Sequence, residues 1–238
     1  IDVISGAETP AVFMALKGGN FSIFALHQKT NSDMSILSFQ NISAVKDLKG
    51  KKIGFPFTSI AHYNIYRLLA EENLTINDVV TIDLSQQNMA SALENRNVDA
   101  VFIWEPNIVK LSQGFGEKIF ELTPNTTAYY SFYASEKFSR DLFGQKKFLR
   151  AIIKAERFLK ENEGEAISIV AKDAALDDQT LKSIMHKFEF GLNEFTEKKI
   201  LEDEAKWAVE SKISESNKLP EFNKLIDNTA VRKVLKEA

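Results

Sequence analysis

The sequence predicts an α/β protein, and two patterns carry that prediction. Between Lys51 and Phe120, short apolar runs alternate with amphipathic runs, which is typical of strand–helix–strand units in a parallel sheet. From Ser135 onward, apolar residues recur at helical spacing over most of the remaining chain. We therefore expect sheets covered by helices, with more helix toward the C-terminus.

The individual elements follow from local signals. Strands are expected over residues 1–6, 52–55, 79–84, 98–103 and 118–120. Helices are expected over 60–72, from a cap at Ser85 through Asn95, and from Pro106, which suits the first turn of a helix. The first of these helices would carry Ala61, Ile65, Leu68 and Leu69 on one face.

Two apolar stripes mark the C-terminal helices. The stronger stripe consists of Phe148, Leu149, Ile152, Ile153, Phe158 and Leu159, and the weaker one of Ile200, Leu201, Ala205, Trp207 and Ala208. We expect both stripes to be buried.

Residues 1–10 resemble residues 98–106, since both runs hold a strand with an early Asp and then a Glu close to a Pro. Two such short matches can arise by chance. If they do not, the chain contains two similar α/β lobes, each with a strand-end loop and a helix N-terminus.

Composition excludes several classes of partner and chemistry. The 238 residues include 30 basic and 33 acidic side chains, so there is no basic excess for nucleic acid or for an anionic membrane surface. Cysteine is absent, which excludes disulfides, thiolate metal sites and a cysteine nucleophile, and leaves both oxidising and reducing compartments open. No apolar run is long enough for membrane insertion of this segment.

Motifs for catalysis are also missing. The three histidines, His27, His62 and His186, do not lie at metal-ligand spacing. The sequence contains no G-x-S-x-G elbow, no phosphate-binding P-loop and no complete G-x-G-x-x-G. We therefore predict that the protein is not an enzyme, with no catalytic residue, no metal site and no cofactor.

Candidate ligand-binding residues lie where strands end. Thr58 and Ser59 precede the helix 60–72, where backbone N–H groups, hydroxyls and the helix dipole favour an anion. A plain helix cap is the more common role for such residues. His62 and Tyr63 follow in the first turn and could reach the same anion or stack on a ligand, or could be surface or core residues. Phe57 lies in the preceding turn, where burial is less automatic.

A second set combines aromatic and acidic groups. Trp104 and Glu105 follow an apolar strand, so a ring for stacking and a carboxylate for an amine would meet at the sheet edge, unless Trp104 is a core residue. Glu8, Thr9 and Pro10 occupy the matching place in the other predicted lobe, with helix capping as the alternative.

Three segments together resemble a known family. Residues 42–54 (ISAVKDLKGKKIG), 58–63 (TSIAHY) and 97–106 (NVDAVFIWEP) are similar to nitrate-, sulfonate- and taurine-type solute-binding proteins of ABC importers, a family that also includes binders of thiamine-pyrimidine precursors. The resemblance is good from Ile1 to about Tyr133 and general thereafter.

The resemblance implies a type II periplasmic-binding-protein fold. Two lobes, each a mostly parallel sheet flanked by helices, would close on a small ligand in the cleft between them. Lobe 1 would comprise residues 1–38 and 131–238, lobe 2 residues 39–130, and the connecting strands would lie near 34–38 and 129–134. The family's ligand contacts map to Thr9–Pro10, to Thr58–Ser59 with His62 and Tyr63, and to Trp104–Glu105.

The implied function is capture of an anion-bearing ligand, such as a sulfonate, a taurine-like or a thiamine-pyrimidine-like molecule, and its delivery to an ABC permease. Glu8 and Glu105 opposite a helix N-terminus would suit a ligand with one cationic and one anionic end. We expect an extracytoplasmic monomer, periplasmic or membrane-anchored.

Two departures from the family pattern stand out. Members usually begin with further strands and helices before the segment that matches Ile1, so we expect that lobe 1 is N-terminally incomplete here and that a signal segment lies outside this chain. The usual glycine-rich turn before the anion-binding helix is replaced by Pro56-Phe57-Thr58, and the bulky Phe57 would narrow the choice of ligand.

Two other functions stay open at this point. The same fold serves as the ligand-sensing domain of membrane receptors, with a fused signalling domain in place of the permease. It also serves pyrimidine-precursor synthases, but a cysteine-rich iron-binding motif marks those enzymes and this chain has no cysteine.

Overall fold

The computed structural model describes residues 1–237 and divides into two compact units. Unit 1 consists of Ile1–Thr30 and the described residues from Ala128 onward, and unit 2 is Asn31–Thr127. The two boundaries lie eight and three residues before those predicted from the family. Strand β3, Met34–Ser38, belongs with unit 2 because all five of its residues pair with β6 of that unit, Ala100–Trp104.

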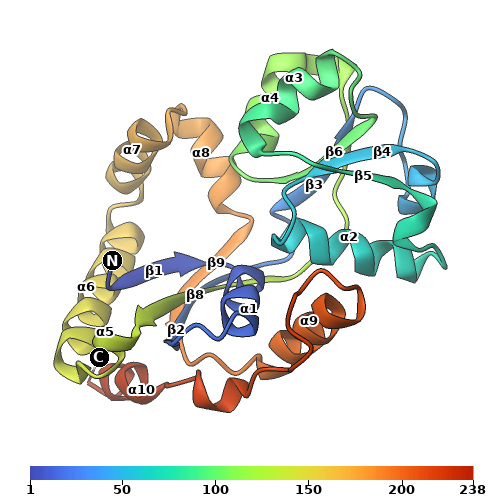
Figure 1. The fold of residues 1–238 in the computed structure, drawn as a ribbon. Helices are drawn as coiled ribbons and strands as arrows, with labels where there is room; N and C mark the ends of the chain where they lie inside the picture. Colours follow the sequence, from blue (N-terminus) through green and yellow to red (C-terminus); the bar gives the residue numbers. More distant parts are fainter. Residues whose placement is uncertain (238) are drawn as a thin grey trace. The chain divides into compact units, whose positions relative to one another are not determined.

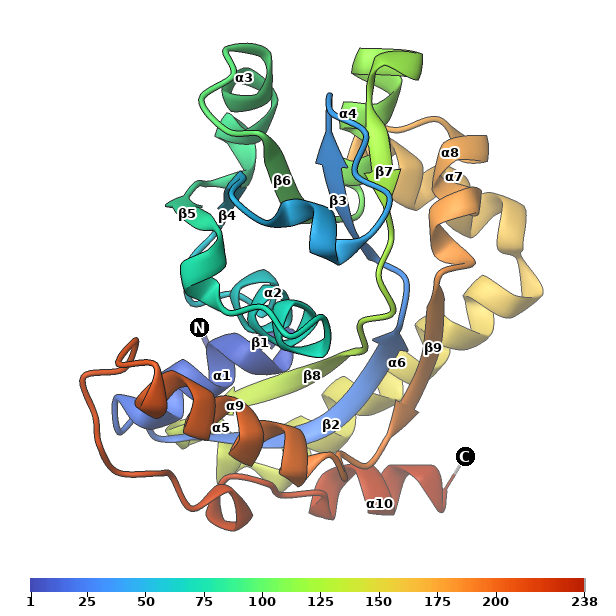
Figure 2. The same cartoon turned by 90° about the vertical axis from the view of Figure 1, so that its right-hand side faces the viewer.

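Unit 1 is built on a four-stranded sheet with the order β1-β8-β2-β9 (Figure 2). Its strands are β1 Val3–Gly6, β8 Ala128–Ser135, β2 Phe21–Thr30 and β9 Phe188–Asn193. Strand β8, which was predicted as a connecting strand near residues 129–134, lies inside this sheet between β1 and β2.

Every pairing between these four strands is antiparallel, so the prediction of a mostly parallel sheet in each lobe is wrong for this unit. The reason is the position of β8. Strands β1 and β2 run in the same direction, as a strand–helix–strand unit requires, but β8 runs between them in the opposite direction. A strand from far along the chain thus separates β1 from β2, the two strands that α1 connects.

Helices cover both faces of the unit 1 sheet. They are α1 Glu8–Leu16, α5 Glu136–Ser139, α6 Leu142–Glu161, α7 Glu163–Ala174, α8 Asp178–Met185, α9 Lys198–Glu210 and α10 Thr229–Leu235. Neighbouring residues of β8 point to opposite faces: Phe132 packs in the core with α6 and α10, and the Tyr133 hydroxyl donates to the Ala7 carbonyl oxygen beside α1 at 3.0 Å.

The predicted apolar stripes are largely confirmed. Leu149 of α6 is fully buried, with Phe148, Ile152 and Ile153 packed around the same core. The end of this stripe behaves differently, because Phe158 and Leu159 line an apolar groove of about 540 Å³ between α6, α7, α8 and β9. In α9, the Trp207 ring meets Phe13 of α1 edge-on at 6.2 Å.

Unit 2 contains a mixed five-stranded sheet with the order β5-β4-β6-β3-β7. The remaining strands are β4 Lys52–Phe55, β5 Val80–Asp83 and β7 Phe120–Leu122. Strands β5, β4 and β6 are parallel, as the strand–helix–strand pattern predicts, whereas β3 runs antiparallel to both β6 and β7.

Helices flank the two faces of the unit 2 sheet (Figure 1). They are α2 Ile60–Glu71, α3 Met89–Glu94 and α4 Asn107–Phe115. Leu37, Val101 and Ile103 pack with α3 and α4, whereas Met34, on the other face of β3, receives a hydrogen bond from Asn64 of α2 to its sulfur at 3.4 Å. Helix α2 and helix α4 therefore lie on opposite faces.

Several elements of unit 2 match the sequence-based prediction closely, with shifts at their ends. The helix expected from Ser85 begins instead as a 3-10 turn, Gln86–Asn88, before α3, and Pro106 immediately precedes α4 rather than starting it. In unit 1, strands β2 and β9 had not been predicted at all. Within the described part of the chain, no helix is both long and apolar enough to span a membrane.

Candidate functional site

The strand order of unit 2 places a topological switch point at the C-terminal ends of β4 and β6. These two strands are parallel neighbours, and the helices that follow them, α2 and α4, lie on opposite faces of the sheet. In open α/β sheets, ligands bind in the crevice that such a divergence creates. The loops that leave this point are residues 56–59 after β4 and 105–106 after β6, and both were singled out from the sequence.

The β4–α2 loop is held by three hydrogen bonds. Asp83, at the end of β5, accepts from the backbone N–H of Phe57 at 2.9 Å. The Nδ1 atom of His62 accepts from the backbone N–H of Thr58 at 3.2 Å, and the Ser59 hydroxyl donates to the Pro56 carbonyl oxygen at 2.6 Å. The loop conformation is thus specified by groups on β5 and α2 as well as by its own residues.

Thr58 adopts a left-handed backbone conformation, with φ of 58°. A β-branched residue rarely does so, and strained residues of this kind are common at ligand-binding loops. The turn allows Ser59 to be the N-cap of α2, although its hydroxyl bonds Pro56 instead of capping the helix.

Backbone donors are available at the start of α2. None of the described residues accepts from the N–H groups of Ser59, Ile60 or Ala61. These groups carry the positive end of the dipole of a 12-residue helix, and the Thr58 side chain beside them is exposed. The arrangement suits a small anion with several oxygen atoms.

His62 supports this loop and is buried, with only 6% of its surface exposed. Its ring stacks on Phe57, with centroids 4.7 Å apart, and lies 5.2 Å from Phe55. Burial lowers the pKa of His62 to about 4 despite the opposing effect of the Asp83 carboxylate. The imidazole is therefore neutral at pH 7, and because Nδ1 accepts a hydrogen bond, its proton is on Nε2. The structure thus assigns His62 a supporting contact with the loop.

Tyr63 is also buried, at 7% exposure, and the Arg67 guanidinium lies over its ring at 6.0 Å. Phe57 differs from its neighbours because 36% of its surface is exposed. Among Phe55, Phe57, His62 and Tyr63, Phe57 is therefore the most exposed residue.

Trp104 and Glu105 lie at the end of β6, on the neighbouring side of the switch point. Trp104 is half-buried and pairs with Met34 in the sheet. Glu105 is buried, its N–H donates to the Asp33 carbonyl oxygen at 2.9 Å, and its Oε2 atom accepts from the Val109 N–H in the first turn of α4 at 3.3 Å. The Glu105 carboxylate thus accepts from the first turn of α4, which is an ordinary structural role for a carboxylate beside a helix N-terminus.

Glu8, Thr9 and Pro10 form the first turn of α1 in unit 1. Glu8 is fully buried, and its Oε2 atom accepts from the Tyr129 N–H of β8 at 2.9 Å. Thr9 is also fully buried, whereas Pro10 is exposed. The Glu8 carboxylate is therefore a structural link between α1 and β8, whatever further role it has.

The residues predicted in unit 2 are thus brought to one edge of its sheet. Sequence reasoning missed Asp83, which fixes Phe57, and the pair in which the Asn107 side chain donates to Gln86 at 3.2 Å and so ties α4 to the β5–α3 connection. Asp83 could have been found, because it also ends a parallel strand of the same sheet.

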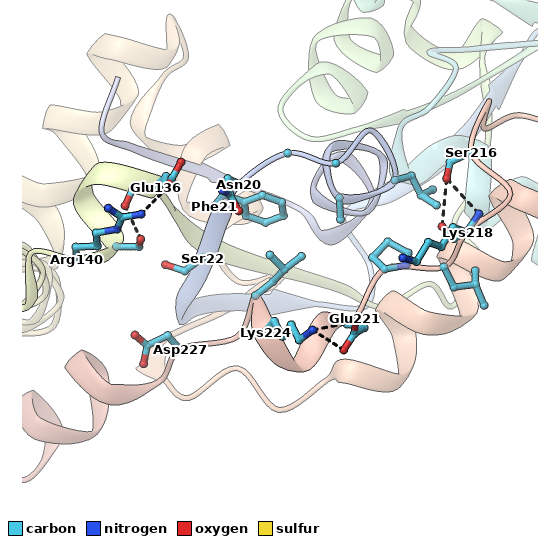
Figure 3. Close-up of a pocket in the computed structure, with 18 residues that line it drawn as sticks. Asn20, Phe21, Ser22, Glu136, Arg140, Ser216, Lys218, Glu221, Lys224 and Asp227 are labelled. Carbon is cyan, nitrogen blue, oxygen red and sulfur yellow. Dashed lines mark hydrogen bonds and ion pairs between the residues drawn. The ribbon is translucent and has the colours of Figure 1, made fainter.

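Unit 1 contains a separate polar cavity. This polar cavity has a volume of about 860 Å³ and is lined by the start of β2, residues of helix α5 and residues 216–227. Figure 3 shows the lining residues. None of the predicted site residues line it, and the charged groups Arg140 and Lys224 form ion pairs there with Glu136 and Glu221. Within residues 1–237, no group of three or more potential metal ligands occurs.

Comparisons with known proteins agree with this architecture. A family model described as NMT1/THI5 like matches residues 12–166. A proposed aliphatic sulfonates-binding protein of Bacillus subtilis (strain 168) is 29% identical over 243 aligned residues, covering 100% of this chain and 73% of the relative.

Two solved structures show the same fold. The periplasmic aliphatic sulphonate binding protein SsuA of Escherichia coli aligns with a TM-score of 0.80 and 19% identity, covering 98% of this chain and 81% of that one. The alkanesulfonate-binding protein SsuA of Xanthomonas axonopodis pv. citri, solved bound to MOPS, aligns with a TM-score of 0.74 and 19% identity, covering 98% and 80%. The fold is that of periplasmic binding proteins.

Proposed function

The chain belongs to the NMT1/THI5-like family, and from this premise we propose that it is a solute-binding protein that captures a small organic sulfonate for an ABC importer. The observation that carries the proposal is the start of α2, where three backbone N–H groups, an exposed threonine hydroxyl and a helix dipole meet at the switch point of the sheet. The relative and the two structural neighbours, all named for sulfonate binding, support the same ligand class.

The charge of the site favours a monoanion. His62 is neutral at pH 7, and the nearby Asp83 is a carboxylate whose oxygen is bound to the loop. A doubly charged phosphate ester would meet this negative charge without a neighbouring cation from His62, whereas a sulfonate carries one negative charge on three oxygen atoms. We therefore rank sulfonates above phosphorylated pyrimidines.

The proposal is tested by calorimetry with butanesulfonate, taurine and a phosphate monoester. Thr58→Val removes the hydroxyl but keeps the side-chain shape, and we expect it to weaken sulfonate binding by about tenfold, the effect of losing one hydrogen bond to a charged group. Thr81→Val, on β5 of the same sheet, is the matched control and should leave the Kd unchanged. Absence of binding to any sulfonate would refute the proposal.

The contributions of Trp104 and Glu105 are tested with Trp104→Ala and Glu105→Gln in the same assay. If neither substitution alters the Kd, these residues do not belong to the site. Glu8, Thr9, Pro10 and Tyr63 remain proposed ligand contacts that similar substitutions would test.

We also propose that the protein acts as an extracytoplasmic monomer that delivers its ligand to a permease without altering it chemically. In a reconstituted importer, the loaded protein should stimulate ATP hydrolysis more than the empty protein does, and the sulfonate should be recovered unchanged. Sedimentation velocity should give a single species with a mass near 26.9 kDa.

A further inference from the structure

Phe57 presents an apolar surface directly beside the proposed anion-binding donors. Its backbone is fixed by the hydrogen bond to Asp83, and its ring is fixed by stacking on His62 at 4.7 Å with an interplanar angle of 27°. Even so, 36% of the residue stays exposed. Phe57 precedes the donor Ser59 by only two residues, so its ring is close along the chain to the N–H groups of 59–61.

The acidic groups of unit 2 at this edge of the sheet offer little to an ammonium. Glu105 is buried and accepts from the Val109 N–H. Asp83 is exposed, and an ion pair at an exposed carboxylate changes affinity by about fivefold at most. An aminosulfonate would therefore gain little from its amine at this loop, and the amine would stay hydrated beside an apolar ring.

Contact with the Phe57 ring favours a sulfonate that carries an apolar group and no amine. Each methylene group that a ligand removes from water by packing on an apolar surface raises affinity by about fourfold. An alkyl or aryl group attached to the sulfonate can cover the exposed face of Phe57, and the ring is already ordered by His62 and Phe55, so little side-chain freedom is lost on binding.

We infer that Phe57 is a specificity-determining residue, and that it selects sulfonates with an apolar body over taurine and other aminosulfonates. This inference rests on the proposed function, because it assumes that the sulfonate group is held at the start of α2. For unit 2, it differs from the expectation from sequence that Glu105 favours a ligand with a cationic end.

The test is a calorimetric series of ethane-, propane-, butane- and hexanesulfonate, with taurine as the amine-bearing match of ethanesulfonate. We expect the Kd to fall about threefold to fourfold for each added methylene until the ring is covered, and taurine to bind more weakly than ethanesulfonate. Phe57→Ala should flatten the series, weakening hexanesulfonate by about tenfold and ethanesulfonate by less than about threefold.

Two further variants test whether the apolar surface of Phe57, and not a change in loop geometry, causes the dependence on ligand chain length. Phe57→Leu keeps an apolar side chain and should retain the dependence on chain length, whereas Phe143→Ala, which removes a large exposed ring from α6 of unit 1, should leave the whole series unchanged. If sulfonates bind but the series is flat in the parent protein, or taurine binds as tightly as ethanesulfonate, the inference is overturned while the proposed function stands. If no sulfonate binds, the proposed function itself fails.

Discussion

Thr58 illustrates how a single residue departs from its local preference when neighbours support it. Its φ of 58° is unfavourable for a β-branched side chain, yet the backbone N–H that this conformation presents is accepted by His62 Nδ1. A strained backbone conformation of this kind persists only where several surrounding contacts hold it in place.

Replacing Thr58 with glycine should therefore stabilise unit 2. We expect Thr58→Gly to raise the free energy of unfolding by about 0.5–1 kcal/mol, because relief of backbone strain outweighs the extra freedom of glycine in the unfolded chain. Urea denaturation measures the change. Asn73→Gly is the control, since Asn73 has the same φ of 58° but asparagine tolerates this conformation, so its gain should be smaller. A loss of stability in Thr58→Gly exceeding that in Asn73→Gly would contradict the strain argument.

For His62, the position could be predicted from the sequence, but the contacts of its side chain could not. Its position in the first turn of α2 suggested contact with a ligand, but the structure buries it among Phe55, Phe57 and the Thr58 N–H. Spacing along the helix gave its approximate place, whereas its side-chain role depended on the loop that folds over it.

At the scale of elements, the close packing of β4 against its neighbours makes Gly54 sensitive. A Cβ atom at this position would lie 2.7 Å from Leu84 Cδ2 and 3.3 Å from Val98 Cγ1. Leu84 can rotate away only against the core that it packs on, so the strand must shift or the core must rearrange.

We expect Gly54→Ala to lower the free energy of unfolding by about 1–3 kcal/mol. Gly114→Ala is the matched control in the same unit, because a Cβ atom there would meet nothing within 4 Å and alanine is the better residue in α4. That variant should gain about 0.5–1 kcal/mol. Equal effects of the two substitutions in chemical denaturation would show that packing at β4 is not the cause.

Elements with strong local periodicity were predictable, and those defined by distant pairing were not. Helix α2 and strand β4 were placed correctly because cap, turn and apolar face all lie within a short stretch of sequence. Strand β9 follows a series of helices, and its residues are ordered by pairing with β2, which lies near the other end of the chain. The local sequence contains no signal of that partner.

At the scale of the whole molecule, acid should destabilise both units. Burial lowers the pKa of His27 in unit 1 to about 4, and burial likewise lowers the pKa of His62 in unit 2 to about 4. In the unfolded chain each histidine titrates near pH 6.5. Between pH 6.5 and 4 the unfolded state therefore binds protons that the folded state does not.

Stability should consequently be constant above about pH 6.5 with respect to these groups and fall as pH drops toward 4. The upper limit of the loss is about 3 kcal/mol per histidine, reduced by whatever solvent reaches the rings. His27→Asn and His62→Asn should each make the decline between pH 6.5 and 4 shallower than in the parent protein, and the double variant should be shallower still. A decline of unchanged slope in the double variant would rule out this explanation. Urea unfolding across this pH range measures it.

The candidate site was predictable to the extent that it follows from strand ends. Thr58, Ser59, Trp104 and Glu105 were found because parallel strands end at one edge of a sheet, and the same rule applies to Asp83. Their individual roles were not predictable, because hydrogen-bond partners such as Val109 for Glu105 are assigned by the path of the loop and not by residue type.

The sequence by itself determined the α/β class, the family, the absence of cysteine and the Pro56-Phe57-Thr58 turn, since all of these reside in composition, periodicity and short motifs. Tertiary structure alone decided that β8 separates β1 from β2, that His62 is buried and neutral, and that Phe57 stays exposed beside the helix donors. The physical reason is that burial and pairing depend on which distant segments come together, and those partners determine both the desolvation of a side chain and the surface left for a ligand.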